Sequence, residues 1–147
     1  VIPAGPSVVD SIANAAFYFG LVNHLADQCD ELIAQIDFQK AKHNFYACAR
    51  HGLAATVYWP DTGHDPVKKV LQEILLPGAR SGLEKLEIEK NDIDKYLGII
   101  EQLIDNEQNG ANWQRHWVQR NGRDMPRLSR SYLDRQNSGS PVHEWSV

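Results

Sequence analysis

The spacing of apolar residues predicts helices along most of the chain. From Val8 to about Ala26, apolar side chains recur every three or four residues, the spacing of one helix face. Ser7 stands at the expected N-cap and Asp10 three residues later, as in a capping box. Because the opposite side of this stretch is also apolar, we expect the helix to be buried on more than one side, as a central helix or against a missing partner.

Capping residues predict where other helices begin and end. Asp37 predicts a helix to about His51 that stops at Gly52. Asp65-Pro66 predicts a second start, and Pro77 is expected to kink or break the helix that follows. The remaining predicted elements are a short turn or ordered loop at 28–36, a helix capped by Asn91 and ending near Asn109-Gly110, a helix carrying Trp113 and Trp117 up to Asn121-Gly122, and a last helix from Asp124 with Leu128, Tyr132 and Leu133 inward.

One stretch favours a strand. Residues 55–59 are rich in β-branched and aromatic side chains and are followed by the turn sequence Pro60-Asp61-Thr62-Gly63. The sequence therefore predicts a mainly α fold, a compact multi-helix unit with one short β element. We expect the helical region to cover residues 1–136 and an irregular tail to cover 137–147, held down by Val142 and Trp145.

Composition excludes several classes of protein. The 147 residues are 42% hydrophobic and 23% charged, as in one globular domain. The net charge of −4 does not suggest a nucleic-acid binder, and no apolar run reaches the ~20 residues of a membrane span. Cys29 and Cys48 are too few for a disulfide scaffold, so we expect a cytoplasmic protein. Because the chain opens Val1-Ile2-Pro3 without Met, we expect it to be a piece of a longer polypeptide.

Charge is distributed unevenly. Eight acidic residues lie between Glu84 and Glu107, and six arginines follow Gly110. The arginines fit either a solvated or ion-paired surface or a site for an anionic ligand. Phosphate-loop, dinucleotide-binding, nucleophile-elbow and zinc-protease motifs are absent, and the six histidines form no close pair in the sequence. We therefore assign no catalytic residue and no metal ligand to this chain.

The most informative segment runs from Asn44 to Leu53. Asn44 and Arg50 lie in the second half of the predicted helix, where an amide and a guanidinium together could hold an anionic or carboxylate-bearing small molecule. Alternatively, both are polar surface residues without a ligand, or Asn44 makes a structural hydrogen bond at the end of the helix.

This segment resembles one found in the type-2 glutamate–cysteine ligases and the related bacterial carboxylate–amine ligases, Asn-x-Trp-x-Ala-x-Arg-x-Gly-Leu followed by a strand. Phe45 or Tyr46 stands in place of the Trp, and the Ala is displaced by one position, at Ala47. Two further likenesses keep the family's order over roughly Val1 to Gln136. They are Asn109-Gly110-Ala111 with Gln114-Arg115, similar to a Gly-Ala…Gln-Arg element, and Val1-Ile2-Pro3-Ala4-Gly5-Pro6-Ser7, similar to the segment after the family's late Glu-x-Arg strand.

The resemblance implies the C-terminal part of a larger α+β, glutamine-synthetase-like ligase whose antiparallel catalytic sheet is absent here. Such an enzyme uses ATP and Mg²⁺ to phosphorylate a carboxylate, and an amine then displaces the phosphate. The sheet would lie before Val1, so we expect this piece to be inactive alone and to need no cofactor. Its implied partners are the N-terminal catalytic part of the same polypeptide, amino acid and amine substrates, and a second copy in a homo-oligomer. Asn44 and Arg50, then Gln114 and Arg115, are the implied substrate or nucleotide contacts.

Two other functions stay open. A stand-alone helical module could use the apolar surface of the first helix or the arginine-rich end to bind a protein. A small regulatory domain could bind an anionic metabolite through the arginines.

Overall fold

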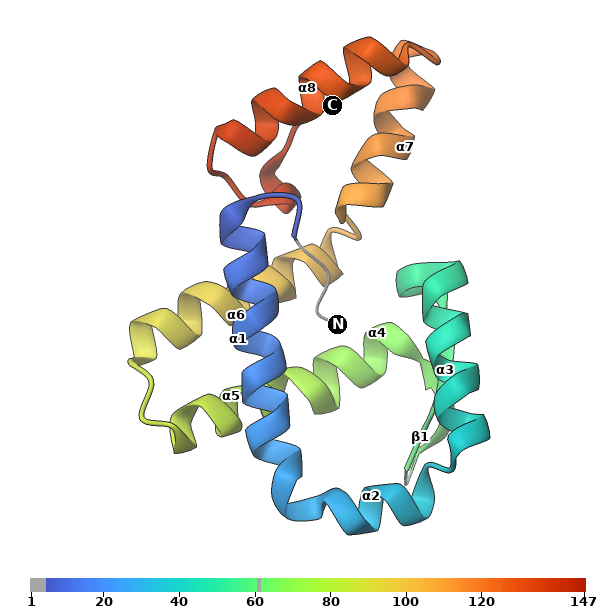
Figure 1. Cartoon of the computed structure of the whole chain (residues 1–147), viewed down its shortest axis with the longest axis vertical. Coiled ribbons are helices and arrows are strands. Elements are labelled where there is room, and N and C mark those ends of the chain that lie inside the picture. Colours follow the sequence, from blue (N-terminus) through green and yellow to red (C-terminus); the bar gives the residue numbers. More distant parts are fainter. Residues whose placement is uncertain (1–4, 61) are drawn as a thin grey trace. The chain divides into compact units, whose positions relative to one another are not determined.

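The computed structural model describes residues 5–60 and 62–147. Helices make up most of this part, together with a two-stranded antiparallel sheet, so the predicted mainly α fold with a short β element is confirmed (Figure 1). The described residues form two compact units. The terminal unit contains residues up to Tyr18 together with Glu89–Val147, and the middle unit is Phe19–Ile88. Val1 to Ala4, cited for the family resemblance, and Asp61 of the predicted turn lie outside the described residues.

The first helix, α1 (Val8–Leu25), runs through both units and begins as predicted. The Ser7 N–H donates to the Asp10 carboxylate at 3.1 Å, and the Asp10 N–H donates to Ser7 Oγ at 3.3 Å, which completes the capping box. Its apolar second side is not buried: Val8 is 74% and Phe19 is 55% exposed. This exposure contradicts the expectation of a central helix buried on both sides, whereas packing against a missing partner stays a prediction.

The middle unit contains the predicted helix and strand. The Asp37 carboxylate accepts the Lys40 N–H at 2.9 Å at the start of α3, and Gly52 ends the helix with a φ of 56°. Residues expected to form only a short turn or loop form the helix α2 instead. The elements of this part are α2 (Cys29–Gln35), α3 (Phe38–His51), the 3₁₀ turn Gly52–Ala54, β1 (Thr56–Trp59) and β2 (Gly63–Pro66).

The helix predicted from Asp65-Pro66 begins one residue later, at Val67, with Pro66 in the N-cap position, and Asp65 and Pro66 themselves end the strand β2. Pro66 lies opposite Thr56 at the end of the two-stranded sheet. Proline, which has no backbone N–H to donate to the ladder, is tolerated at such an end position. The Asp65 carboxylate accepts a hydrogen bond from Lys69 Nζ at 3.1 Å rather than capping. The helix α4 (Val67–Val70) follows without a side-chain cap.

Pro77 does not break its helix. Helix α4 continues into a π-helical turn, Leu71–Leu75, and then into α5 (Leu76–Lys85), which Figure 1 shows as one ribbon. The wider π turn lies directly ahead of Pro77 and relieves the clash that a proline ring makes with the carbonyl one turn back. Helix α5 crosses α1 closely: a Cβ atom at Gly82 would lie 1.9 Å from the Gly20 carbonyl oxygen, so only glycine fits there.

The terminal unit contains three further helices. Glu89, rather than the predicted Asn91, precedes the first of these helices, and it makes no side-chain cap. Asn109, which the sequence places at the end of that helix, caps the following helix instead. The Asp124 carboxylate accepts the Arg127 N–H at 3.1 Å, as predicted. Leu133 is 52% exposed, not inward. The elements are α6 (Lys90–Asp105), α7 (Gly110–Asn121), α8 (Met125–Asn137) and the 3₁₀ turn Val142–Glu144.

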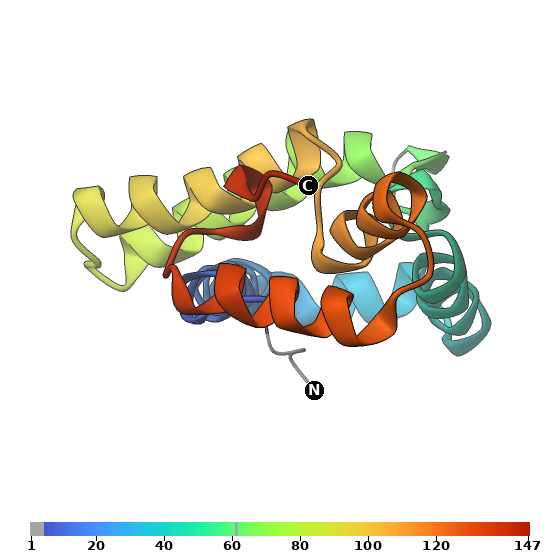
Figure 2. The ribbon, with the colours of Figure 1, turned by 90° about the horizontal axis from the view of Figure 1, so that it is seen from above.

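The core of the terminal unit is aromatic. Trp113 and Trp117 of α7 pack with Val142 and Trp145 of the tail, and these four side chains are at most 4% exposed. Figures 1 and 2 show the tail running between α6 and α8. The predicted anchoring of the tail by Val142 and Trp145 is thus confirmed. Among the described residues, none of the helices combines the length and apolar character needed to cross a bilayer.

Candidate functional site

Asn44 connects α3 to the hairpin. Its Nδ2 donates to the Tyr58 carbonyl at 2.8 Å, and its Oδ1 accepts the Tyr58 N–H at 2.7 Å. The amide therefore pairs with the outer edge of β1 as a neighbouring strand would. Lys40, one turn earlier on α3, places its ammonium 4.3 Å from the centre of the Tyr58 ring. This geometry gives Asn44 a positioning role, and its contact with a ligand stays a prediction.

Replacing Asn44 with alanine is expected to lower the free energy of unfolding by about 2 kcal/mol, because two hydrogen bonds are lost and the Tyr58 peptide loses its partner. Urea unfolding measures the change. Asn23→Ala is the matched control, since the Asn23 amide donates to the Phe19 carbonyl within its own helix. Equal stability of the two variants would contradict the role given to Asn44.

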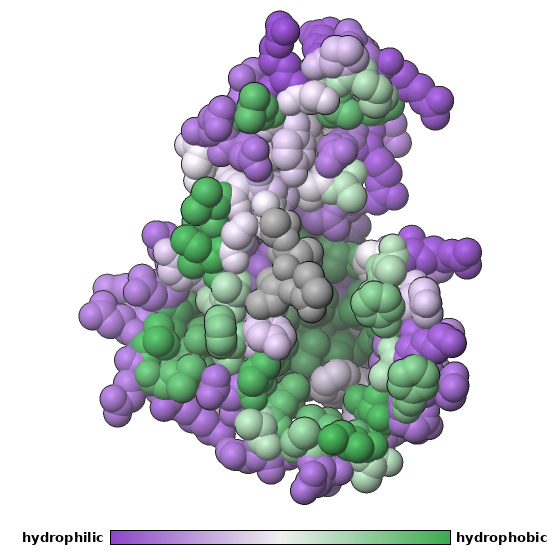
Figure 3. Space-filling view, in the orientation of Figure 1, coloured by the Kyte–Doolittle hydropathy of each residue, from purple (hydrophilic) through white to green (hydrophobic). Residues whose placement is uncertain are grey.

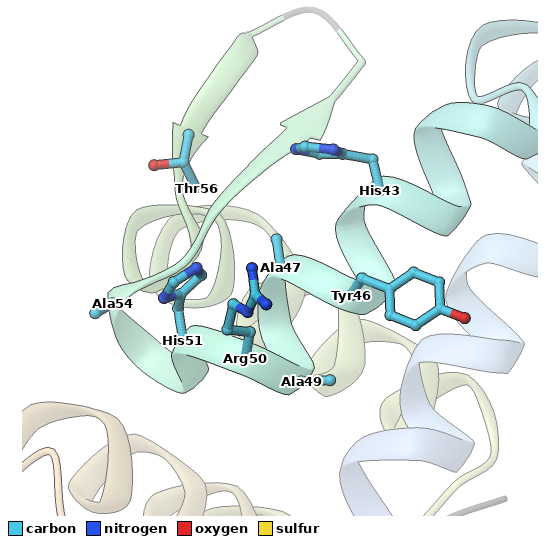
Figure 4. Close-up of a pocket in the computed structure, with 8 residues that line it drawn as sticks. All are labelled: His43, Tyr46, Ala47, Ala49, Arg50, His51, Ala54 and Thr56. Atoms are coloured by element: carbon cyan, nitrogen blue, oxygen red, sulfur yellow. The ribbon is translucent and has the colours of Figure 1, made fainter.

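An open hollow lies beside the C-terminal half of α3 (Figure 4). Arg50 and His51 project to the same side of the helix as Ala47, whereas the Tyr46 ring points the other way. The hollow combines the end of α3 with the 3₁₀ turn and the start of β1. The lining residues are His43, Tyr46, Ala47, Ala49, Arg50, His51, Ala54 and Thr56.

The hollow is cationic although the chain as a whole is acidic. None of its lining residues is Asp or Glu, and residues 38–51 contain three Lys or Arg and two His but no acid. Cations at a helix C-terminus are favoured by the helix dipole, which accounts for some of this pattern. The Arg50 guanidinium also offers a planar fork that matches carboxylate and phosphate oxygens. The arrangement can bind an anion through Arg50, His43 and His51.

Cys48 is a free cysteine on the same helix. It is half-buried on α3, and burial raises the pKa of its thiol above the ordinary value. A raised pKa keeps the sulfur in its weakly nucleophilic thiol form. This fits a small apolar side chain rather than an activated nucleophile.

Gln114 and Arg115 belong to the other unit, on α7. Gln114 lines a separate hollow between α7 and α8 whose other polar groups are the hydroxyls of Ser129 and Tyr132 and the amide of Gln136. Arg115 is exposed, and its guanidinium donates to the Asn112 side-chain carbonyl. The predicted site residues therefore fall into two pairs, one in each unit.

Two of the six arginines that follow Gly110 hold the tail. Arg120 donates to the Val147 carbonyl at 2.5 Å, and Arg135 donates to Ser146 Oγ at 2.7 Å. Arg127 lies over the Trp117 ring, 5.9 Å from its centre. Arg120, Arg127 and Arg135 thus have structural contacts within the terminal unit.

The sequence did not single out His43, His51 and Thr56 as neighbours of Arg50. Residues 38–51 contain no Asp or Glu, and this lack of acidic side chains is the feature of the sequence that could have drawn attention to the two histidines. Among the described residues, no three His, Cys, Asp or Glu side chains gather as a metal site requires. Comparison of the chain with family models, with curated proteins and with solved structures gives no match.

Proposed function

We propose that this chain is the helical C-terminal region of an ATP-dependent carboxylate–amine ligase of the glutamate–cysteine type, acting in the cytoplasm. The cationic hollow beside α3 carries the proposal, because it lies where the segment resembling the family's motif ends in Arg50-His51-Gly52-Leu53. The order of the resembling segments along the chain supports it further.

In this proposal the chain contributes anion contacts rather than the chemical step. Arg50 pairs with carboxylate or phosphate oxygens, and the imidazoles of His43 and His51 add hydrogen-bond donors. Bound ATP and Mg²⁺ would supply the activating phosphoryl group and neutralise its charge. The acidic ligands of Mg²⁺ belong, in the proposal, to the N-terminal catalytic part. The chain alone is therefore expected to release no ADP from ATP.

The uncovered side of α1 supports a large partner. Val8 is 74%, Phe19 55% and Val22 46% exposed on this helix. Exposed apolar side chains gathered on one element are typical of a surface that another protein or domain covers. In the proposal, the catalytic sheet of the same polypeptide covers them.

Arg50→Ala in the longer polypeptide is expected to lower kcat/KM at least tenfold, a loss of about 1.4 kcal/mol in transition-state stabilisation. The assay is ADP release with ATP, Mg²⁺, an acidic amino acid and an amine. Arg130→Ala, which removes an exposed arginine of α8, is the control and should leave the rate unchanged. Wild-type kinetics in Arg50→Ala would remove this residue from the site, and no ADP release by the wild-type polypeptide would overturn the proposed function.

A stand-alone helical interaction or regulatory module is the second candidate. It is favoured by Phe38 and Phe45 of α3, which are 75% and 70% exposed. The reading frame upstream of Val1 discriminates between the two. An in-frame segment of strands carrying acidic residues supports the ligase, and a start codon next to Val1 supports the module.

A further inference from the structure

Helix α3 has an outer face that is mainly apolar and exposed. Phe38 is 75% and Phe45 70% exposed, and Ala41 and Lys42 between them are exposed as well. These four residues, called the α3 face, stand at positions i, i+3, i+4 and i+7, which share one side of a helix. The opposite side packs on the hairpin through Asn44, and none of the four residues lines the cationic hollow. Figure 3 shows apolar side chains gathered over α2 and α3. Exposed aromatic rings on one helix face are typical of a surface that binds a protein.

The α3 face is also cationic. Residues 38–51 contain Lys40, Lys42 and Arg50 but no Asp or Glu, and Lys42 stands one turn from each phenylalanine. Asp37, just ahead of the helix, is engaged as the N-cap. Two α3 faces placed against each other would bring like charges together, so the face does not suit pairing with itself. A partner with acidic and apolar side chains is the one that complements it.

The end of α5 carries that complementary pattern. Leu86 and Ile88 are 45% and 43% exposed, and the carboxylates of Glu84 and Glu87 beside them are exposed. The turn has a fixed shape, because the Glu87 N–H donates to the Glu84 carbonyl at 3.0 Å and the Ile88 N–H donates to the Leu83 carbonyl at 3.2 Å. We call residues 84–88 the α5 turn.

The lysine of the α5 turn does not cancel its negative charge. Lys85 Nζ lies 3.2 Å from the Asp27 carboxylate, so this cation already has an acidic neighbour outside the turn. Glu84 and Glu87 therefore leave the turn acidic. The α5 turn and the α3 face thus match in two respects, since each has exposed apolar side chains and the two carry opposite charges.

Both surfaces belong to the middle unit, and Figures 1 and 2 show α3 and the end of α5 on opposite sides of it. They cannot meet within one molecule, but the α3 face of one copy can meet the α5 turn of another. We propose that the α3 face binds the α5 turn of a second copy of this chain. In this contact the two phenylalanines cover the apolar side chains of the turn, and Lys42 pairs with its carboxylates. The proposal does not depend on the ligase function, because the hollow beside Arg50 takes no part.

The test is sedimentation velocity of the 147-residue chain from about 10 μM to about 1 mM, at low salt. A contact between opposite sides of a molecule is head-to-tail, so the mean mass should rise with concentration beyond that of a dimer. Raising the salt tenfold should raise the Kd at least tenfold, because it screens the charge pairs. A chain that stays monomeric, or one whose association ignores salt, would overturn the proposal.

Charge reversal locates the contact. Lys42→Glu and Glu87→Lys change exposed side chains, and each should raise the Kd at least tenfold, because like charges then face each other. An equimolar mixture of the two variants should associate again, since every contact between them joins opposite charges. Arg130→Glu makes the same charge change on α8 and should leave the Kd unchanged. Association that survives either reversal, or a mixture that stays monomeric, would refute this pairing.

The apolar part of the contact has its own variant. Phe45→Ala should raise the Kd at least tenfold, whereas Met125→Ala, at a position 48% exposed on α8, should not change it. Circular dichroism of each variant should stay helical, because all the altered side chains are exposed. The alternative occupant is a membrane surface. Binding of a monomeric wild-type chain to phosphatidylserine vesicles, lost in Phe45→Ala, would assign the α3 face to a membrane and overturn the proposal.

Discussion

Trp113→Ala is expected to lower the free energy of unfolding of the terminal unit by about 4 kcal/mol. The Trp113 side chain is 0% exposed, and its ring meets those of Tyr132 and Trp145 edge-to-face, with centroids 5.7 and 5.6 Å apart. Its indole N–H donates to the Ser146 carbonyl at 3.3 Å. The substitution removes the central ring of this core and leaves a cavity lined by the remaining aromatic side chains.

Urea unfolding, followed by near-ultraviolet circular dichroism, measures this loss. Leu133→Ala is the control from the same unit, because Leu133 is 52% exposed and its removal should change stability by less than about 1 kcal/mol. Trp113→Phe keeps a ring but not the N–H donor and should fall between the two. If Trp113→Ala is as stable as Leu133→Ala, the aromatic cluster is not what stabilises the unit.

Local signals predicted most helix ends correctly. Ser7, Asp37 and Asp124 cap the helices that the sequence assigns to them, and Gly52 and Gly122 end theirs with positive φ. These signals act between a side chain and a backbone group within four residues, so they can be recognised without the rest of the fold. The same local character explains why the short β element was found.

Two of the errors arose where strand pairing or an unusual helical turn overrides a local preference. Asp65-Pro66 has the pattern of a helix start, but pairing with Thr56 and Val57 extends it as a strand. Pro77 is expected to kink or break its helix, and the break does not occur because a π-helical turn accommodates the ring. Neither strand pairing across a turn nor a π turn has a signal in the spacing of apolar residues.

The candidate site was predicted only in part. The sequence placed Arg50 at the end of a helix, and the structure adds His43 and His51 to the same hollow. The sequence also left open whether Asn44 contacts a ligand or makes a structural hydrogen bond. The structure shows two hydrogen bonds between its side chain and the Tyr58 backbone. Those bonds join residues fourteen positions apart, so they could not be read from the helix alone.

The tail depends on contacts that join the two ends of the chain. Gln108 Nε2 donates to the Val142 carbonyl at 2.8 Å and to the Trp145 carbonyl at 2.9 Å. At the other end of the sequence, both oxygens of Asp10 accept the Val142 N–H, at 3.2 and 3.1 Å. Asp10 is thus a helix-capping residue and also an anchor for the tail, 132 residues away.

Asp10→Ala is therefore expected to cost more than the loss of an ordinary cap. The carboxylate is 2% exposed and accepts from the Ser7 N–H, from Ser7 Oγ at 2.7 Å, and from the Val142 N–H. Removing it leaves buried donors without a partner, in addition to a lost cap of about 1 kcal/mol. We expect a total loss of about 3 kcal/mol in the free energy of unfolding, with faster hydrogen exchange at the Val142 amide.

Asp124→Ala separates these two contributions. Asp124 also caps a helix of the terminal unit but is exposed, so its removal should cost about 1 kcal/mol and leave Val142 exchange unchanged. Asp10→Asn offers one acceptor oxygen and turns an N–H₂ donor toward the donors around it, so it should not restore the protection of Val142. If Asp10→Ala matches Asp124→Ala in both stability and exchange, Asp10 is only a cap, and the tail is held by Gln108 and the aromatic core.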